Sequence, residues 1–305
     1  MKQIKAYHVF TQYQPIPFLG VNLLVQLASA LHWKRLYGSI GLICNEPFYR
    51  LLEQYPGFLD VYDTVDYTSL NVENQTVWWA APKILCNEFI PESEYVILDT
   101  DLIVLDYFNP AHETFSWCGF HRETFNDVSY KHISELTDEQ SLIEAEAIPV
   151  NTALLYVKDK ALITEWVNKA KAIMDTVVPE EISKSYMITL EQLLLPTITE
   201  VQGKTSSYVI TNIADTSKKY KQQEPLWTPN AYDRKEFTKG NVLNVLKYMK
   251  HIWGAKNPYL DETISYLLYN ISNDIILIFP EYKELSQELQ KCIYDEGCSL
   301  NPLTT

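Results

Sequence analysis

The first hundred or so residues alternate short apolar runs with longer segments in which apolar side chains recur every three or four positions. The short runs have the length of buried strands, and they are residues 4–10, 39–44, 61–65 and 95–98. The longer segments are typical of helices, and they are residues 21–37, 46–54 and 77–89. Strands joined by helices require crossover connections, so this half predicts a parallel, doubly wound α/β sheet.

The regular alternation stops after residue 105. Residues 109–130 are rich in aromatic side chains, His and Asn without a clear period, and we expect an irregular segment that lines a site. A strand is predicted at residues 153–157, followed by helices at 161–174 and 185–195, the second ended by Pro196.

The last third of the chain contains a polar segment, residues 215–235, whose prolines indicate a surface loop or lid. Residues 242–250 resemble a helix. The second half is therefore expected to be mixed α+β. We expect one compact domain with two halves, residues 1–107 and residues 108–305.

The charge balance limits the possible partners. A net charge of −14 and a pI near 4.9 disfavour nucleic acid, because the mean field of the protein repels phosphates. The 5 cysteines are scattered without a C-x-x-C pair, which indicates reduced thiols and neither a disulfide framework nor a zinc site. No signal-peptide pattern and no apolar run of about 18 residues is present, so we expect a cytoplasmic protein without a transmembrane segment.

An acidic pair interrupts one of the apolar runs. Asp99 and Asp101 directly follow the predicted strand at 95–98 and precede a second apolar run at 102–105. Carboxylates at such a position are costly unless a cation pairs with them. Residues two apart on an extended chain point to one side, and two oxygen donors on one side suit Mg²⁺ or Mn²⁺. The alternative is that the two aspartates cap a turn or hold a structural ion.

The chain lacks the usual means of binding a diphosphate. It has only 9 glycines and neither G-x-x-x-x-G-K-[ST] nor G-x-G-x-x-G, so no backbone cradle for phosphate is predicted. An acidic protein without such a loop needs a metal to hold a diphosphate. The acidic pair therefore predicts a site for a divalent cation together with a phosphate-bearing ligand.

The run Tyr95–Leu105, YVILDTDLIVL, resembles the metal-binding strand of GT-A-fold glycosyltransferases, especially the retaining glycogenin and bacterial lipopolysaccharide galactosyltransferase family. Further stretches agree with that family in order and spacing, and they are WWAAPKIL before the acidic pair and VNTALL and TLEQLLLP after it. HIWGAK, which begins at residue 251, is similar to the family's C-terminal H-x-x-G motif. The resemblance covers residues 1–260. It implies a GT-A fold, with a mostly parallel sheet flanked by helices, a UDP-sugar donor, and a glycan, glycolipid or protein acceptor.

The resemblance also implies roles for individual residues. The metal ligands are Asp99, Asp101 and His251, and the catalytic pair beneath the sugar is Glu191 and Gln192. The residues expected to bind the nucleotide-sugar are Thr11, Lys83, Thr100, Asn151, Thr152, Gly254 and Lys256. In this scheme residues 1–107 bind the nucleotide-sugar, and residues 108–305 provide the catalytic and acceptor half.

The sequence departs from the family pattern at several positions. Ala153 stands where the family usually has Gly, and Glu191 stands where it usually has Asp. Lys256 falls one residue early, which weakens its assignment to phosphate. Asn151 also fits a simple turn, and Glu191 and Gln192 also fit a solvent-facing helix surface.

Two other functions stay open. Haloacid-dehalogenase-like phosphohydrolases also carry D-x-D-x-[TV] after an apolar strand, but Ile103 departs from that pattern and the chain has no D-D pair. A protein of the same fold that binds sugar nucleotides without turnover is the third reading. The identities of the donor sugar and the acceptor are set by loops and are not encoded in any motif of the chain. The resemblance implies retention of configuration, whereas the residues themselves do not separate retention from inversion.

Overall fold

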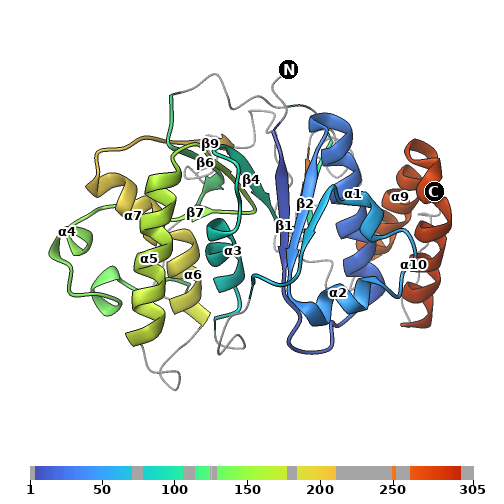
Figure 1. Ribbon diagram of the computed structural model, residues 1–305, viewed down its shortest axis with the longest axis horizontal. Coiled ribbons are helices and arrows are strands. Elements are labelled where there is room, and N and C mark those ends of the chain that lie inside the picture. Colours follow the sequence, from blue (N-terminus) through green and yellow to red (C-terminus); the bar gives the residue numbers. More distant parts are fainter. Residues whose placement is uncertain are drawn as a thin grey trace.

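The computed structural model describes residues 4–70, 78–105, 107, 114–123, 125, 129–176, 184–210, 249–251 and 262–296, with side chains excepted at 210, 249–251 and 262–267. Helices lie on both faces of a central sheet (Figure 1). The sheet thereby separates two apolar cores, one beneath α1 and the C-terminal helices and one beneath the helices of the middle of the chain.

The central sheet has eight strands among the described residues, in the order β3-β2-β1-β4-β8-β6-β7, with β9 also paired to β6. The first four strands in this order are parallel, and they are β3 (Thr64–Asp66), β2 (Ile40–Cys44), β1 (Ala6–Phe10) and β4 (Tyr95–Leu98). The others are β8 (Leu154–Val157), β6 (Trp117–Arg122), β7 (Val150–Asn151) and β9 (Ser206–Ile210). β8 runs antiparallel to β4 and β6, while β9 is parallel to β6. A separate two-stranded sheet joins β5 (Leu102–Val104) to β10 (Met249–His251).

The α-helices of the described residues are α1 (Leu19–Tyr37), α2 (Glu46–Leu52), α3 (Ala81–Leu85), α4 (Gln140–Ile143), α5 (Lys160–Thr176), α6 (Lys184–Gln192), α7 (Leu194–Val201), α9 (Glu262–Ile278) and α10 (Lys283–Asp295). Short 3-10 turns lie at Leu59–Val61, Cys86–Glu88, Ile133–Glu135 and Pro280–Tyr282. None of the helices in these parts of the chain is both long and apolar enough to cross a bilayer.

Helix α1 is buried on both sides, between the sheet and the pair α9 and α10 (Figure 1). It ends as the sequence predicts, because Gly38 adopts a left-handed φ of 88° and its N–H donates to Lys34 O. At the next helix, the Asn45 side chain accepts from Phe48 N and begins α2. The predicted first, second and fourth strands are confirmed, and so is the parallel half of the sheet.

Four sequence-based expectations are wrong in detail. The third strand begins three residues later than predicted because Leu59–Val61 forms a 3-10 turn, and the third helix is reduced to Ala81–Leu85 followed by another 3-10 turn. Within the segment expected to be irregular, Trp117–Arg122 is strand β6, whose pairing with β8 and β9 compensates for its mixed composition. Residues 249–251 belong to strand β10 instead of a helix.

Pro196 does not end a helix but lies inside the first turn of α7, where its missing N–H is not needed for helical hydrogen bonding. The break falls at Leu193 instead, between α6 and α7. The predicted loop at residues 215–235 lies outside the described residues.

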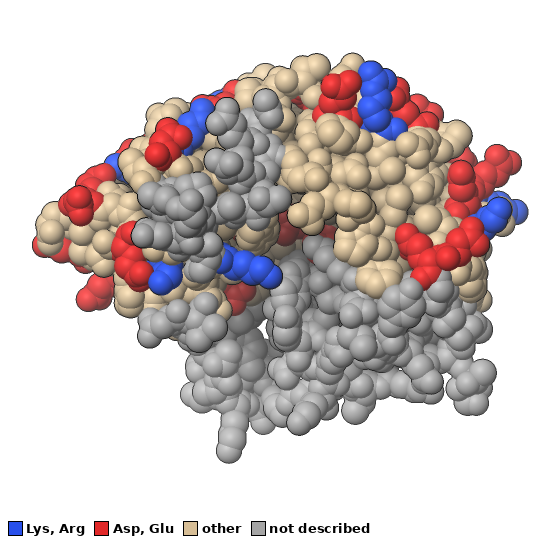
Figure 2. Space-filling model, turned by 90° about the horizontal axis from the view of Figure 1, so that it is seen from below, with Lys and Arg blue, Asp and Glu red and all other residues tan. Residues whose placement is uncertain are grey.

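The surface of the described residues mixes both signs of charge. On the face in Figure 2, Lys and Arg side chains are interspersed with Asp and Glu.

Strand β6 is fixed to α7 by one buried hydrogen bond, which generates a stability prediction. Trp117 Nε1 donates to Thr199 Oγ1 over 2.7 Å, so Thr199→Val leaves the indole N–H buried without an acceptor. A buried unsatisfied donor costs about 1–3 kcal/mol. We expect the unfolding free energy, measured by urea denaturation, to fall by that amount relative to the control Thr197→Val.

The control removes the same hydroxyl from the same helix. Thr197 and Thr199 are both buried, and each donates to the carbonyl four residues earlier, but Thr197 accepts no indole bond. Equal losses of stability in the two variants would contradict the role given to the Trp117 contact.

Candidate functional site

The acidic pair lies on a tight turn at the carboxyl end of β4. Leu102 N donates to Asp99 O over 3.1 Å, and Asp99 N donates to Ala153 O over 2.8 Å. The expectation that the aspartates lie on an extended strand is therefore wrong, because the chain turns between β4 and β5. Asp99, Thr100 and Asp101 of this turn are all half-buried. The turn presents its carboxylates at the edge of the sheet where ligands bind in open α/β folds.

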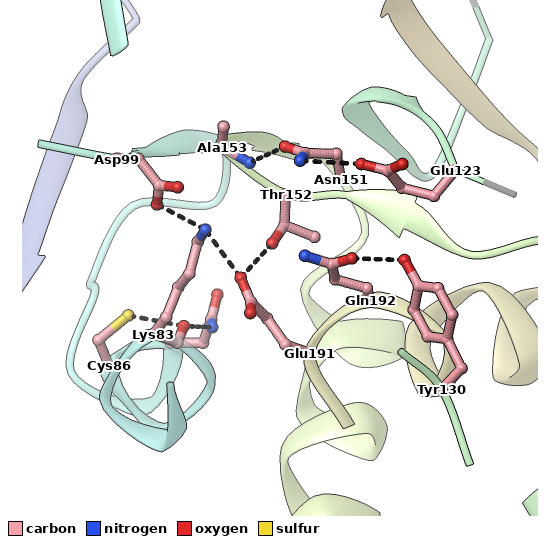
Figure 3. A network of polar contacts seen from close by, with 11 residues as sticks. Lys83, Cys86, Asp99, Glu123, Tyr130, Asn151, Thr152, Ala153, Glu191 and Gln192 are labelled. Carbon is pink, nitrogen blue, oxygen red and sulfur yellow. Dashed lines mark hydrogen bonds and ion pairs between the residues drawn. The ribbon is translucent and has the colours of Figure 1, made fainter. Parts of the chain in front are cut away.

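A buried ammonium group connects this turn to a distant helix. Lys83 Nζ of α3 lies 2.5 Å from Asp99 Oδ1 and 3.0 Å from Glu191 Oε1 of α6, between the two carboxylates (Figure 3). The Lys83 and Glu191 side chains are 11% and 6% exposed, whereas Asp99 keeps 34%. The site is thus closed on the helix side and open to solvent at the turn.

The electrostatics of this group show competing effects. Burial lowers the pKa of Lys83, but the attraction of Asp99 and Glu191 outweighs it and the pKa is raised. Burial raises the pKa of the Asp99 carboxyl, Lys83 lowers it, and the like charges of Asp101 and Glu191 raise it again, with a net upward shift. One ammonium group does not balance the negative charge at the turn.

Glu191 is held inside the protein. Thr152 Oγ1 donates to Glu191 Oε1 over 2.6 Å, and Lys83 binds the same oxygen (Figure 3). Neither of these bonds uses Oε2. The solvent-facing alternative for Glu191 is wrong, because α6 turns this residue toward the sheet and not toward water.

Gln192 and Asn151 are each oriented by a residue that the sequence analysis did not single out. Tyr130 donates its hydroxyl to Gln192 Oε1 over 2.8 Å, which leaves the amide nitrogen on the side of Thr152 and Glu191 (Figure 3). The Asn151 amide donates to Glu123 Oε1 over 3.2 Å. Burial, with added repulsion from Glu123 and Glu191, raises the pKa of Tyr130, so its hydroxyl stays protonated.

Tyr130 and Glu123 come from the aromatic segment that was expected to line a site. No local motif marks either of them, because their role depends on the fold that places β6 beside β7. The only signal was the unusual composition of residues 109–130. Asn151 also uses its Oδ1 to accept from Ala153 N, the local turn contact that the sequence left open.

The remaining expected residues are placed only in part. Thr11 follows β1, the neighbour of β4 in the parallel sheet, so it lies at the same sheet edge as the acidic turn. The backbone of His251 pairs with Leu102, directly after Asp101, which places this residue beside the turn. Gly254 and Lys256 lie outside the described residues.

The carboxylates of Asp99 and Asp101 provide part of the ligand set that a hard divalent cation needs. Two carboxylates on one turn, with a like-charge repulsion that a cation would relieve, suit Mg²⁺ or Mn²⁺. Among the residues whose side chains are described, no three His, Cys, Asp or Glu converge on a metal position. A complete shell therefore requires a further ligand, from His251 or from phosphate oxygens.

The sequence matches no family model and no curated protein, whereas the fold matches solved structures. The apo form of the glycosyltransferase GlyE of Streptococcus pneumoniae TIGR4 aligns with a TM-score of 0.50 and 12% identity, over 95% of this chain and 64% of GlyE. The galactosyltransferase LgtC, in complex with donor and acceptor sugar analogs, aligns with a TM-score of 0.45 and 10% identity, over 93% of this chain and 96% of LgtC. Mouse xyloside xylosyltransferase 1 aligns with a TM-score of 0.43 and 9% identity, over 84% of this chain and 99% of the mouse protein.

The match with GlyE shows a shared fold. The expected GT-A glycosyltransferase fold, with a mostly parallel sheet that continues into antiparallel strands, is confirmed. The chain spans 64% of the length of GlyE. The phosphohydrolase alternative has its acidic pair after the first strand, whereas here the pair follows the fourth strand along the chain.

The Lys83 bridge predicts a pH-dependent loss of stability. In Lys83→Met, Asp99 and Glu191 lose their common cation, and breaking such a pair costs about 2–4 kcal/mol at pH 7 once the exposure of Asp99 is discounted. Because the pKa of Asp99 is already raised in the folded protein, ionising it opposes folding, and removal of Lys83 strengthens this opposition. We expect the deficit to be small near pH 4 and to grow toward pH 7 in urea denaturation.

Lys131→Met is the matched control, because Lys131 forms an exposed i,i+4 pair with Glu135. That variant should change stability little at any pH. A Lys83→Met deficit that is independent of pH would contradict the electrostatic account.

Proposed function

We propose that the protein is a metal-dependent glycosyltransferase that moves a hexose from a UDP-sugar to an acceptor hydroxyl, with retention of configuration. The observation that carries the proposal is the Lys83 ammonium group between Asp99 of the acidic turn and Glu191 of α6. This contact gathers at one sheet edge the residues that resemble the donor-binding positions of a glycosyltransferase family. The shared fold with GlyE supports the same class.

In this proposal Asp99 and Asp101, with His251, hold Mn²⁺ or Mg²⁺, which when bound neutralises charge on the diphosphate leaving group. Lys83 adds positive charge on the same side, and its attraction lowers the pKa of Asp99 against the larger effect of burial. Thr11, Thr100 and, outside the described residues, Gly254 and Lys256 are the further proposed contacts to the nucleotide-sugar.

The opposite side of the site provides polar groups for the sugar. Glu191 Oε2 is not used by Lys83 or Thr152 and is suited to accept from a sugar hydroxyl. The Gln192 amide nitrogen and Asn151 add donors on the same side, and Gln192 lies near the face opposite the leaving group in the proposed arrangement. The Glu191 carboxyl group accepts hydrogen bonds and the Gln192 amide nitrogen donates them, so together they can orient a sugar ring that carries several hydroxyl groups.

The acceptor is a glycan, a lipid-linked sugar or a protein, and the proposed location is the cytoplasm, with contact to a membrane surface through a glycolipid acceptor left open. A protein that binds the donor without turnover is the competing outcome of the tests below.

Removal of one carboxylate from the turn should abolish metal-dependent donor binding. In Asp101→Asn, we expect Mn²⁺-dependent UDP affinity, measured by calorimetric titration, to fall by more than the roughly 10–100-fold typical of losing an outer-shell partner. The control is Asp138→Asn, which removes an exposed carboxylate of the segment before α4 and should bind as the wild type does. Unchanged affinity in Asp101→Asn would sink the metal assignment.

A screen of UDP-sugars for Mn²⁺-dependent UDP release identifies donor and class together, with Asp99→Ala as the inactive reference. On the donor that is turned over, Tyr130→Phe should lower kcat about tenfold with little change in KM, because a lost orienting hydrogen bond costs about 1–1.5 kcal/mol.

Tyr156→Phe controls for the loss of a buried phenol. Its hydroxyl donates to Glu94 at the other end of β4, away from the acidic turn. Equal kcat values for Tyr130→Phe and the wild type would contradict the proposed role of Tyr130 in orienting Gln192. If the protein binds UDP but releases no UDP from any UDP-sugar, a non-catalytic binding protein is favoured instead.

A further inference from the structure

A chain of buried polar groups lies behind the acidic turn, in the apolar core beneath α1. Gln26 Nε2 is 2.9 Å from the Tyr62 hydroxyl, which is 3.0 Å from His8 Nδ1. His8 Nε2 is 3.0 Å from Ser29 Oγ, and Ser29 Oγ is 2.6 Å from the carbonyl oxygen of Leu102. Each of the four side chains is at most 6% exposed. The chain of bonds thus crosses from α1 through β1 to the first residue of β5.

The last acceptor determines the direction of the bonds from His8 to Leu102, and the neutral charge of His8 determines the bond to Tyr62. A carbonyl oxygen only accepts, so Ser29 donates its single proton to Leu102 O. Ser29 Oγ must then accept from His8 Nε2–H, which leaves His8 Nδ1 as the acceptor of the Tyr62 hydroxyl. The Tyr62 oxygen in turn accepts from the Gln26 amide.

His8 is neutral because it is fully buried, and Ser29 holds it in the Nε2–H tautomer. Burial lowers the pKa of His8 to about 3, with the Asp101 charge opposing the shift. A second proton on His8 would also leave Nδ1–H facing the Tyr62 hydroxyl, whose proton already points toward it. With the Gln26 amide nitrogen donating to the Tyr62 oxygen, a protonated His8 would leave the Tyr62 hydroxyl proton without an acceptor in this chain.

The far end of the chain fixes the backbone that carries the acidic pair. Leu102 follows Asp101 directly, and its N–H is already bonded to Asp99 O inside the turn. With its carbonyl held by Ser29, both peptide groups that flank Leu102 have fixed orientations. The turn is thus secured to Ala153 on one side and to α1 on the other.

We infer that Ser29, oriented by His8, is a positioning residue of the acidic turn and sets the direction in which Asp101 presents its carboxylate. The inference rests on the proposed metal-binding function of that turn. An apolar set of side chains would fill the same space at lower desolvation cost, and a fully satisfied polar network instead specifies one backbone arrangement. Ser29 touches no substrate and acts only through Leu102.

The test compares two buried serines. Ser29→Ala should weaken Mn²⁺-dependent UDP binding about tenfold, at the lower end of the range for outer-shell partners, and should also lower Tm. Ser286→Ala is the matched control, because Ser286 Oγ lies 2.8 Å from Ser272 Oγ between α10 and α9, away from the turn, and both residues are fully buried. It should lower Tm without changing UDP affinity. Both titrations are done below the unfolding temperature of each full-length variant.

A spectroscopic signature tests the hydrogen-bond direction independently of metal. In ¹⁵N-labelled protein, imidazole NMR signals should show His8 as the neutral Nε2–H tautomer from pH 5 to 8, assigned by their loss in His8→Gln. Tyr62→Phe removes the donor to Nδ1 and should disturb this tautomer and weaken UDP binding in the same direction as Ser29→Ala.

The outcomes separate the inference from the function on which it rests. Ser29→Ala with a lowered Tm and wild-type UDP affinity overturns the inference and leaves the proposed function standing. A wild-type protein that shows no Mn²⁺-dependent UDP binding overturns both. A His8 that titrates between pH 5 and 8, or that carries its proton on Nδ1, overturns the positioning chain.

Discussion

The site depends on one buried ammonium group that two carboxylates share. Lys83, Asp99 and Glu191 come from α3, from the turn after β4 and from α6, and their contacts hold these three elements together. A buried charge without a partner is costly, so the three side chains are stable in this position only as a group. Thr152 completes the group by donating to the same oxygen of Glu191, which joins the start of β8 to it.

The charge of this group is unbalanced on the solvent side. Lys83 is one cation facing the carboxylates of Glu191 and Asp99, with Asp101 close by. Burial, and after it the like charges of Asp101 and Glu191, raise the pKa of Asp99 against the attraction of Lys83. The cluster therefore has two different sides. Lys83 and Glu191 form a buried, charge-paired side, while Asp99 is half-exposed on the side where a cation could bind. This asymmetry is the physical reason to treat the turn as a binding site and not only as a cap.

The sequence predicts the parallel half of the sheet well, because its strands are unbroken apolar runs bounded by clear helix signals such as Gly38. Predictions from the sequence fail where tertiary structure overrides the local pattern. Strand β6 forms although it includes Gly119 and His121, and helix α7 contains Pro196 in its first turn. Asp99 and Asp101 were found from their place after a strand, but their turn geometry was not. The approach of Lys83 to Glu191 follows from no spacing rule, since 108 positions separate them. Tyr130 and Glu123 carry no signal beyond the composition of residues 109–130, and the chain through His8 and Ser29 carries no local signature.

A crystal structure of the protein with UDP and Mn²⁺, with the metal located by its anomalous scattering, is the decisive experiment for the acidic turn. We expect a manganese peak coordinated by Asp99 and Asp101 and by oxygens of the diphosphate, with the Lys83 contact to Glu191 preserved. A metal and nucleotide bound away from the turn, with Asp99 and Asp101 coordinating neither, would contradict this expectation.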